Sequence, residues 1–292
     1  MIVILVKKIL RKLLAFLTPV TKVYPQIVTL SQNKLLDGRT ALITGGTSGI
    51  GFEIARSFIN AGAQVIITGR SQNRVEEAVS LLHEEFNKKD NAFGVVMDIT
   101  DIEEIKSKVN ETILMTKGHL DILVNNAGIN GGNFINGSPE EFDNVINTNL
   151  KGVFFLSKVI SDFMIKNKIE GNILNVASSS SLRPAISAYG LSKWGIVGLT
   201  QGLARLLAPK GIIVNGIAPG PTATPMQGVS KGGDIGLSAN LVGRFALPEE
   251  IGSMAVILVS NMSRMIVGDV LYMTGGSGLV YNEDINYPFD NK

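Results

Sequence analysis

The sequence predicts an α/β protein built on a doubly wound parallel sheet of about seven strands, with helices on both faces. Three observations predict it. Short apolar runs rich in β-branched residues alternate with stretches of helical period, the connections are short, and a glycine-rich turn follows the first run directly. The runs lack strict polar alternation, which is typical of strands covered on both faces. We therefore expect one sheet domain over residues 38–292, preceded by a segment, 1–37, of different character.

The predicted elements follow one another regularly along the chain. We expect strands at 40–44, 64–68, 92–97, 120–124, 172–177, 212–217 and 270–274. Helical patterns lie between them at 53–61, 74–86, 102–115, 140–165, 188–207 and 249–259. Ligands of such sheets bind outside the carboxyl ends of the strands, so the residues that follow each strand are the candidates for function.

Composition narrows the function classes. The 292 residues are 45% hydrophobic and carry a net charge of +2, so a large core is expected and nucleic acid is not an expected partner. Cysteine is absent, which excludes disulfides and thiolate chemistry and is consistent with a reducing, cytoplasmic compartment. The two histidines, His83 and His119, lie far apart in sequence. We therefore expect neither a metal centre nor a Ser-His-Asp triad.

The first 37 residues resemble a basic amphipathic segment. If residues 2–17 form a helix, the cations Lys7, Lys8, Arg11 and Lys12 share one sector, opposite an apolar one. That layout is typical of a helix lying on an anionic surface, and Lys7 and Lys8 interrupt the apolar run that a spanning helix would need. Three interpretations stay open: an arm packed on its own or a neighbouring subunit, peripheral membrane contact through residues 1–17, and a targeting signal.

A phosphate-binding turn follows the first predicted strand. The chain reads Thr44-Gly45-Gly46-Thr47-Ser48-Gly49-Ile50-Gly51 and then becomes helical. Glycines there permit the tight turn, the approach of backbone to a pyrophosphate and close helix packing, while the free N–H groups and the positive helix end bind the anion. We expect the dinucleotide contacts to come from Gly45, Thr47, Ser48, Gly49, Ile50 and Gly51. A purely structural turn is the alternative.

The ends of the second and third strands bear on the choice of cofactor. No acid occurs from Gln64 to Val75, where one would bind the ribose 2′-hydroxyl of NAD(H). Arg70 stands there instead, and its guanidinium can pair with a 2′-phosphate and lie on the adenine. NADP(H) is therefore favoured over NAD(H), with a solvated surface arginine as the alternative. Asp98, after the third strand, either accepts from the adenine amino group or caps the next helix.

Tyr189 and Lys193 are the candidate acid–base pair. They stand four residues apart and share one face if 188–207 is a helix. An ammonium about 4 Å from a phenolate contributes on the order of 4 kcal/mol at an effective dielectric near 20, which corresponds to about three pKa units. We therefore expect Lys193 to lower the pKa of Tyr189 toward neutrality, where proton transfer is efficient.

Taken together, the motifs of residues 38–277 resemble the short-chain dehydrogenase/reductase family. The matching elements, in order, are the turn Thr44–Gly51, Asn125-Asn126-Ala127-Gly128, Asn149, Asn175-Val176-Ala177-Ser178, the pair Tyr189 and Lys193, Pro219-Gly220 with Thr224, Arg244-Phe245 with Pro248-Glu249-Glu250, and Gly275-Gly276. The resemblance implies a Rossmann fold, and an oxidoreductase that transfers hydride between NADP(H) and a carbonyl or secondary alcohol.

The resemblance also implies roles for single residues. Tyr189 would exchange a proton with the substrate oxygen, Lys193 would lower its pKa and bind the nicotinamide ribose, and Ser178 would orient the substrate oxygen. Asn149 would hold a water that links Lys193 to solvent. Further cofactor contacts are expected from Ile99, Asn126, Ala127, Gly128, Pro219, Gly220 and Thr224. The spacing of eleven residues from Ser178 to Tyr189 is shorter than usual in the family, so Ser179 remains the alternative serine.

Substrate and assembly are less sharply defined by the sequence. Residues 221–243 are glycine-rich and carry few charges, which favours either a mobile lid over an uncharged or partly apolar substrate, or packing on the core. The resemblance implies 3-oxoacyl thioesters, sugars or polyols, or small ketones as substrates. It also implies a homodimer or homotetramer built from 140–165 and 188–207. A catalytically silent NADP(H)-binding scaffold or sensor is the alternative function.

Overall fold

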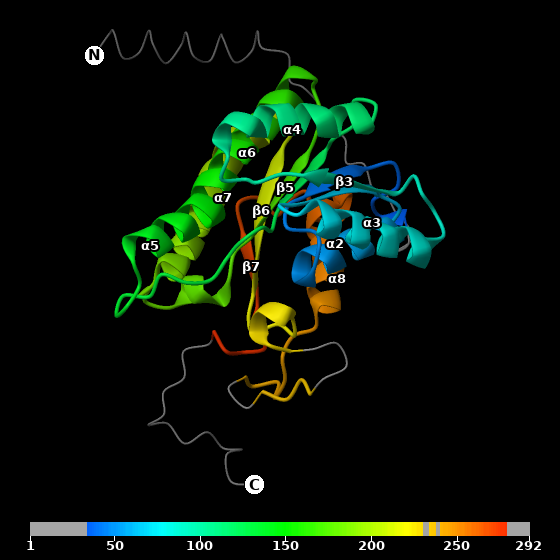
Figure 1. Cartoon of the computed structure of the whole chain (residues 1–292). Coiled ribbons are helices and arrows are strands. Elements are labelled where there is room, and N and C mark those ends of the chain that lie inside the picture. Colours follow the sequence, from blue (N-terminus) through cyan, green and yellow to red (C-terminus); the bar gives the residue numbers. More distant parts are fainter. Residues whose placement is uncertain (1–33, 230–233, 238–239, 279–292) are drawn as a thin grey trace, which may run out of the picture. The chain divides into compact units, whose positions relative to one another are not determined.

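The protein is a seven-stranded parallel sheet with helices on both faces, as predicted (Figure 1). The computed structural model describes residues 34–229, 234–237 and 240–278. The strands are β1 (Thr40–Ile43), β2 (Gln64–Gly69), β3 (Ala92–Val96), β4 (Ile122–Asn125), β5 (Asn172–Val176), β6 (Ile213–Pro219) and β7 (Val270–Met273). Their order across the sheet is β3-β2-β1-β4-β5-β6-β7, and each pairing is parallel.

The helices form two layers, one on each face of the sheet (Figure 1). One layer packs α2 (Gly49–Asn60), α3 (Gln72–Phe86) and α8 (Pro248–Val259) against the strands through a continuous apolar cluster. A second cluster lies between the opposite face and the other layer, which contains α4 (Ile102–Met115), α6 (Gly152–Lys166) and α7 (Ala188–Leu207). Both faces of the central strands are therefore buried, which explains why these strands read as continuous apolar runs.

The helix predicted over 140–165 is interrupted. The structure has α5 (Pro139–Ile146), a π-helical turn at Asn147–Lys151, and then α6. Periodicity alone does not reveal a turn with i→i+5 hydrogen bonds, because the residues on either side keep a helical pattern. The interruption has a consequence for the site, since Thr148 and Asn149 of this turn are buried toward the sheet.

The N-terminal segment is only partly described. Leu36 is fully buried in the core beside α2, and its N–H donates to the carbonyl of Ala61 at 2.9 Å. The sheet domain thus includes residues before 38. The amphipathic helix and membrane contact predicted for 1–17 lie outside the described residues and stay predictions. Among the described residues, no helix is both long and apolar enough to cross a bilayer.

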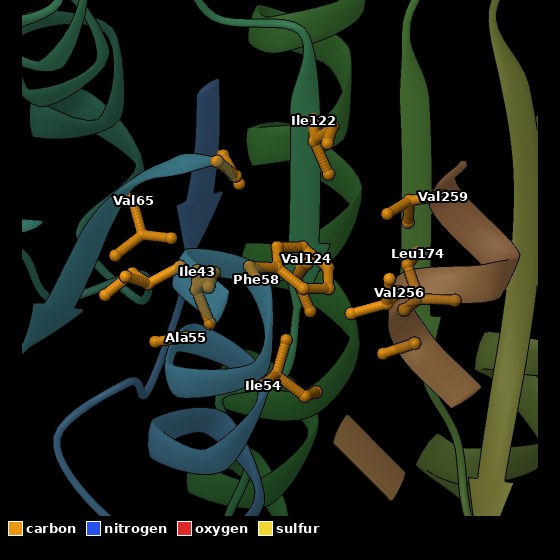
Figure 2. Packing of buried hydrophobic residues seen from close by; sticks show 14 of the residues in the cluster. Ile43, Ile54, Ala55, Phe58, Val65, Ile122, Val124, Leu174, Val256 and Val259 are labelled. Carbon is orange, nitrogen blue, oxygen red and sulfur yellow. The ribbon is translucent and has the colours of Figure 1, made fainter. Parts of the chain in front are cut away.

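Phe58 anchors α2 in the core. Figure 2 shows its ring among side chains of β1, β4, β5 and α8, including Ile43, Val124 and Val256. The side chain is completely buried, and burying a phenylalanine contributes roughly 1.5–3 kcal/mol to the free energy of folding. Since α2 begins in the glycine-rich turn, this packing also fixes where that turn stands.

Phe58→Ala is therefore expected to destabilise the protein by about 3–5 kcal/mol, because a cavity adds to the lost burial. Urea denaturation followed by circular dichroism measures the change. Leu114→Ala is the matched control, since Leu114 is 79% exposed on α4 and its truncation leaves no cavity. Equal losses in the two variants would contradict the assignment of Phe58 to the core.

Candidate active site

A cavity of about 810 Å³ opens at the carboxyl ends of the strands. It lies where the strand order reverses between β1 and β4, which is the position at which doubly wound sheets bind ligands. The cavity brings together all predicted site residues except Asn149. Those on its wall are Gly45, Thr47, Ser48, Gly49, Ile50, Gly51, Arg70, Asp98, Ile99, Asn126, Ala127, Gly128, Ser178, Ser179, Tyr189, Lys193, Pro219, Gly220 and Thr224.

The glycine-rich turn is shaped to receive a phosphate group. Gly45 and Gly49 have φ angles of +64° and +57°, a region that side chains with a Cβ rarely adopt. A Cβ on Gly51 would lie 2.3 Å from Nδ2 of Asn126 and 2.4 Å from the carbonyl oxygen of Gly45, so only glycine fits. Because α2 begins at Gly49 with no acidic residue in its first turn, its positive end faces the cavity and favours an anion.

The far end of the cavity carries two arginines. Arg70 follows β2 as predicted, and Arg74, in the first turn of α3, lines the same cavity. Arg74 was not predicted from the sequence, although a second arginine four residues after Arg70, in the first turn of the helix that follows β2, is the signal that could have found it. Two guanidinium groups at this end fit a phosphate on an adenosine ribose.

Asp98 does not cap the next helix, so that interpretation is wrong. Helix α4 begins at Ile102, and its cap is Asp101, whose side chain accepts from the N–H of Glu104 at 3.2 Å. Asp98 lies too far upstream for that role. Its Oδ1 instead accepts from the backbone N–H and the hydroxyl of Thr100, at 2.9 and 2.8 Å. This turn holds the Asp98 carboxylate on the wall of the cavity.

Tyr189 and Lys193 enter the cavity from the first turns of α7. The helix is capped by Ser187, whose hydroxyl accepts from the N–H of Gly190 at 3.0 Å. Lys193 is only 5% exposed, its Nζ donates to the carbonyl of Val176 at 2.8 Å, and it lies 5.7 Å from the centre of the Tyr189 ring. Burial lowers the pKa of Lys193 to about 8.

The expected lowering of the Tyr189 pKa is wrong for this arrangement. Burial raises the pKa of Tyr189, and a hydrogen bond with Ser178 opposes that rise. The expectation placed an ammonium about 4 Å from the phenol oxygen, whereas Nζ of Lys193 is engaged by the Val176 carbonyl and lies over the ring. Tyr189 is accordingly a neutral phenol at neutral pH.

Ser178 is better placed than Ser179 to act with the tyrosine. It stands two residues beyond the end of β5, its side chain is close enough to Tyr189 to oppose the rise in the pKa of that phenol, and its hydroxyl accepts from the N–H of Ser180 at 3.1 Å. Ser179 begins a 3₁₀ turn that ends at Leu182. These contacts support Ser178 as the serine that orients a substrate oxygen.

Asn149 is not on the cavity wall, and its side chain makes hydrogen bonds to other residues of the protein. Oδ1 accepts from the N–H of Ile129 at 2.8 Å, while Nδ2 donates to the carbonyl of Ile129 at 2.9 Å and to the hydroxyl of Ser192 at 3.1 Å. The residue is 1% exposed. Its side chain thus ties the π-helical turn to the loop after β4 and to α7. This geometry supports a positioning role for Asn149.

A second buried network supports the site from below. Nδ2 of Asn125 donates to Oδ1 of Asn175 and to the hydroxyl of Ser157, at 2.8 and 2.9 Å. Nδ2 of Asn175 donates in turn to the hydroxyl of Thr200 at 2.9 Å. The network joins β4 and β5 to α6 and α7, so it fixes the helix of Tyr189 against the strand that ends at Ser178.

The segment predicted as a lid is partly described, since 230–233 and 238–239 lie outside the described residues. Its ends are held by isolated bridges between Thr222 and Ala246 and between Gly236 and Arg244. Arg244 donates to both carboxylate oxygens of Glu250, at 2.7 and 2.9 Å, and this pairing lowers the pKa of Glu250 to about 2. The motif residues Arg244 and Glu250 thus anchor the segment to the start of α8.

The lowered pKa of Lys193 predicts a pH-dependent difference in stability between the wild type and Lys193→Met. The folded protein releases this proton near pH 8, whereas the unfolded chain keeps it to about pH 10.4. Burial of the ammonium therefore destabilises the folded state below pH 8, and this penalty fades as the pH rises. We expect Lys193→Met to be the more stable protein at neutral pH, with an advantage that shrinks by up to about 1.4 kcal/mol per pH unit above pH 8.

Urea denaturation between about pH 7 and pH 9.5 measures this trend, and Lys158→Met is the control. Lys158 pairs with Asp162 on the exposed face of α6, so its variant should show no such convergence with the wild type. Tyr189, with its raised pKa, works in the opposite direction only above about pH 10. An advantage of Lys193→Met that stays constant over the whole range would show that the ammonium is not buried.

Comparison with known proteins agrees with this geometry. A family model described as short chain dehydrogenase matches residues 39–233. A 3-oxoacyl-(acyl-carrier-protein) reductase of Thermotoga maritima is 36% identical over 246 residues, which cover 82% of this chain and 98% of that protein. A crystal structure of the 3-ketoacyl-(acyl-carrier-protein) reductase of Brucella melitensis with NADH is 31% identical, with a TM-score of 0.74 and coverage of 84% and 100%. A structure of an actinorhodin polyketide ketoreductase variant with NADPH is 30% identical, with a TM-score of 0.75 and coverage of 86% and 100%.

Proposed function

Because this chain belongs to the short-chain dehydrogenase family, we propose that it transfers hydride between NADP(H) and a carbonyl or secondary alcohol of a small molecule. The observation that carries the proposal is a single cavity with a phosphate-binding turn in its middle, two arginines at one end, and Ser178, Tyr189 and Lys193 at the other. The similar proteins named above include reductases of 3-oxoacyl groups and a polyketide ketoreductase. We therefore place 3-oxoacyl thioesters first among the substrates to test.

The cavity fits a dinucleotide with a 2′-phosphate. The turn around Gly45 and Gly51 is a cradle that any Cβ would fill, and α2 directs its positive end to the phosphates. Arg70 and Arg74 supply positive charge where the 2′-phosphate would lie. When bound, the nicotinamide supplies the hydride. The tasks left to this chain are to bind, to orient and to move a proton.

The protonation state of Tyr189 suits reduction. Its raised pKa keeps the phenol protonated at neutral pH, so the hydroxyl can donate its proton to a carbonyl oxygen as hydride reaches the carbon. Lys193, which its pKa of about 8 leaves mostly protonated at pH 7, places its positive charge 5.7 Å from the centre of the ring, where it offsets part of the negative charge that develops on the phenol during the transfer. Ser178 donates to the same substrate oxygen and holds it against Tyr189.

Tyr189→Phe tests the proton transfer. Loss of the hydroxyl should lower kcat for acetoacetyl-CoA with NADPH by about 10²–10⁴-fold, while NADPH binding measured by fluorescence stays as in the wild type. Tyr272→Phe is the matched control, since the Tyr272 hydroxyl bonds to Ser181 at 3.1 Å and lies off the cavity wall. Turnover by Tyr189→Phe at the wild-type rate would refute the assignment. Failure of the wild type to oxidise NADPH with any ketone would favour a silent scaffold.

Arg70→Ala tests the choice of cofactor. A charge-assisted contact with a 2′-phosphate contributes roughly 1.5–3 kcal/mol, so we expect the KM for NADPH to rise about 10- to 100-fold and that for NADH to change little. Steady-state kinetics with both cofactors measure the difference. Arg205→Ala removes an exposed arginine from the last turn of α7 and should leave both constants unchanged. A parallel rise in both KM values would instead give Arg70 a structural role.

A further inference from the structure

Positively charged residues outnumber acidic ones among the described residues that line the cavity. Of the described residues on its wall, four are cationic, namely Arg70, Arg74, Arg183 and Lys193, and one, Asp98, is acidic. The function proposed above uses the first two arginines for a 2′-phosphate and Lys193 at the reacting end. Arg183 is left without a role, and Asp98, on the side of Arg70, is the one acidic residue that the described part of the chain places on the cavity wall.

Arg183 stands too far from the other arginines to share their phosphate. It follows Ser178 by five residues, at the end of the 3₁₀ turn Ser179–Leu182 that continues from β5. Arg70 follows β2, and β1 and β4 lie between β2 and β5. Three strand spacings of about 4.8 Å put roughly 14 Å between the two strands. Arg183 therefore belongs to the end of the cavity that holds Ser178 and Tyr189.

Two hydrogen bonds fix Arg183 at this end. Its carbonyl accepts from Nε1 of Trp194 at 2.9 Å, which ties it to the residue beside Lys193 on α7. Its Nη2 donates to the carbonyl of Ser277 at 2.8 Å. One such bond uses one of the five guanidinium N–H groups. Over the part of the chain that the structure describes, the ion pairs involve other arginines, namely Arg39, Arg56, Arg244 and Arg264.

We propose that Arg183 binds an anionic group of the substrate, a carboxylate or a phosphate, and so selects acidic ketones or alcohols over neutral ones. The proposal rests on the function proposed above, which places the reacting carbonyl between Ser178 and Tyr189. A guanidinium held by its backbone and one N–H keeps a donor face for a bidentate contact with an oxyanion. This differs from the uncharged substrate favoured by the composition of 221–243, because the cation comes from a different loop.

Paired substrates that differ only in charge test the proposal. The first pair is 5-oxohexanoate and its methyl ester, and the second is acetoacetyl-CoA and the neutral acetoacetyl-N-acetylcysteamine thioester. The wild type should have the higher kcat/KM for the charged member of at least one pair, and which pair responds identifies a carboxylate or a phosphate. Arg183→Gln should lower kcat/KM for that charged member by at least about tenfold, or ~1.4 kcal/mol, and leave its neutral partner unchanged.

Two further variants sharpen the result. Arg183→Lys keeps the charge without the planar fork, so it should retain part of the preference. Arg205→Gln removes an exposed arginine away from the cavity and should retain all of it. An equal loss for charged and neutral substrates in Arg183→Gln would overturn the proposal and make Arg183 a support for Ser277. No loss for any substrate would overturn it as well.

A binding measurement separates this proposal from the function on which it rests. If the wild type binds NADPH but reduces none of the ketones, the proposed function has failed. Glutarate and, separately, inorganic phosphate are then titrated into the NADPH complex, with nicotinamide fluorescence as the readout. Binding that weakens at least about tenfold in Arg183→Gln and not in Arg205→Gln would support the anion site even so. Equal binding by both variants, or no binding to the wild type, would overturn it.

Discussion

The shape of the cavity depends on the hydrogen bonds between Thr44 and Asn126. Nδ2 of Asn126 donates to the carbonyls of Thr44 and Gly45, at 2.9 and 3.0 Å, while the hydroxyl of Thr44 accepts from the N–H groups of Asn126 and Ala127, both at 3.1 Å. They join the ends of β1 and β4, the two neighbouring strands at which the chain changes direction across the sheet. A doubly wound sheet opens a crevice at that point. Here the crevice edges are tied by side chains, so the phosphate-binding turn is held in place before any ligand arrives.

The reacting end is built from groups whose polarity is costly to bury. A carbonyl is the only hydrogen-bond partner described for the Lys193 ammonium, and the asparagines below it are satisfied mostly by one another and by hydroxyls. Removing one partner of such a buried polar group costs more free energy of folding than the hydrogen bond contributes on balance, because the remaining partner is left buried without a bond. Burial thus places the polar groups needed for proton transfer in an environment that disfavours their charged forms, as the lowered pKa of Lys193 and the raised pKa of Tyr189 show.

Sequence patterns predicted the features that depend on residues close together in the chain. The strands, the glycine turn and α7 follow from local apolar runs and glycine spacing, and most candidate residues meet in one cavity because parallel strands end at one edge. Other features depend on tertiary contacts between residues that are far apart in the sequence. The sign of the Tyr189 pKa shift is decided by burial, which outweighs the opposing hydrogen bond with Ser178, and the role of Asp98 depends on where α4 begins. The proposed role of Arg183 depends on its position on the cavity wall beyond β5, where the described part of the chain places no acidic residue beside it.

The π-helical turn between α5 and α6 also changes the angular positions that a helical wheel assigns to the residues of these two helices. Phe142 of α5 and Phe154 of α6 are 41% and 48% exposed. Twelve residues apart, they would sit about 120° from each other on an uninterrupted helical wheel, at about 100° per residue. A π turn inserts one surplus residue without adding rotation, which reduces the separation to about 20°. Two rings that a wheel assigns to different sides are therefore expected on one side of the helix pair, where a partner would meet both.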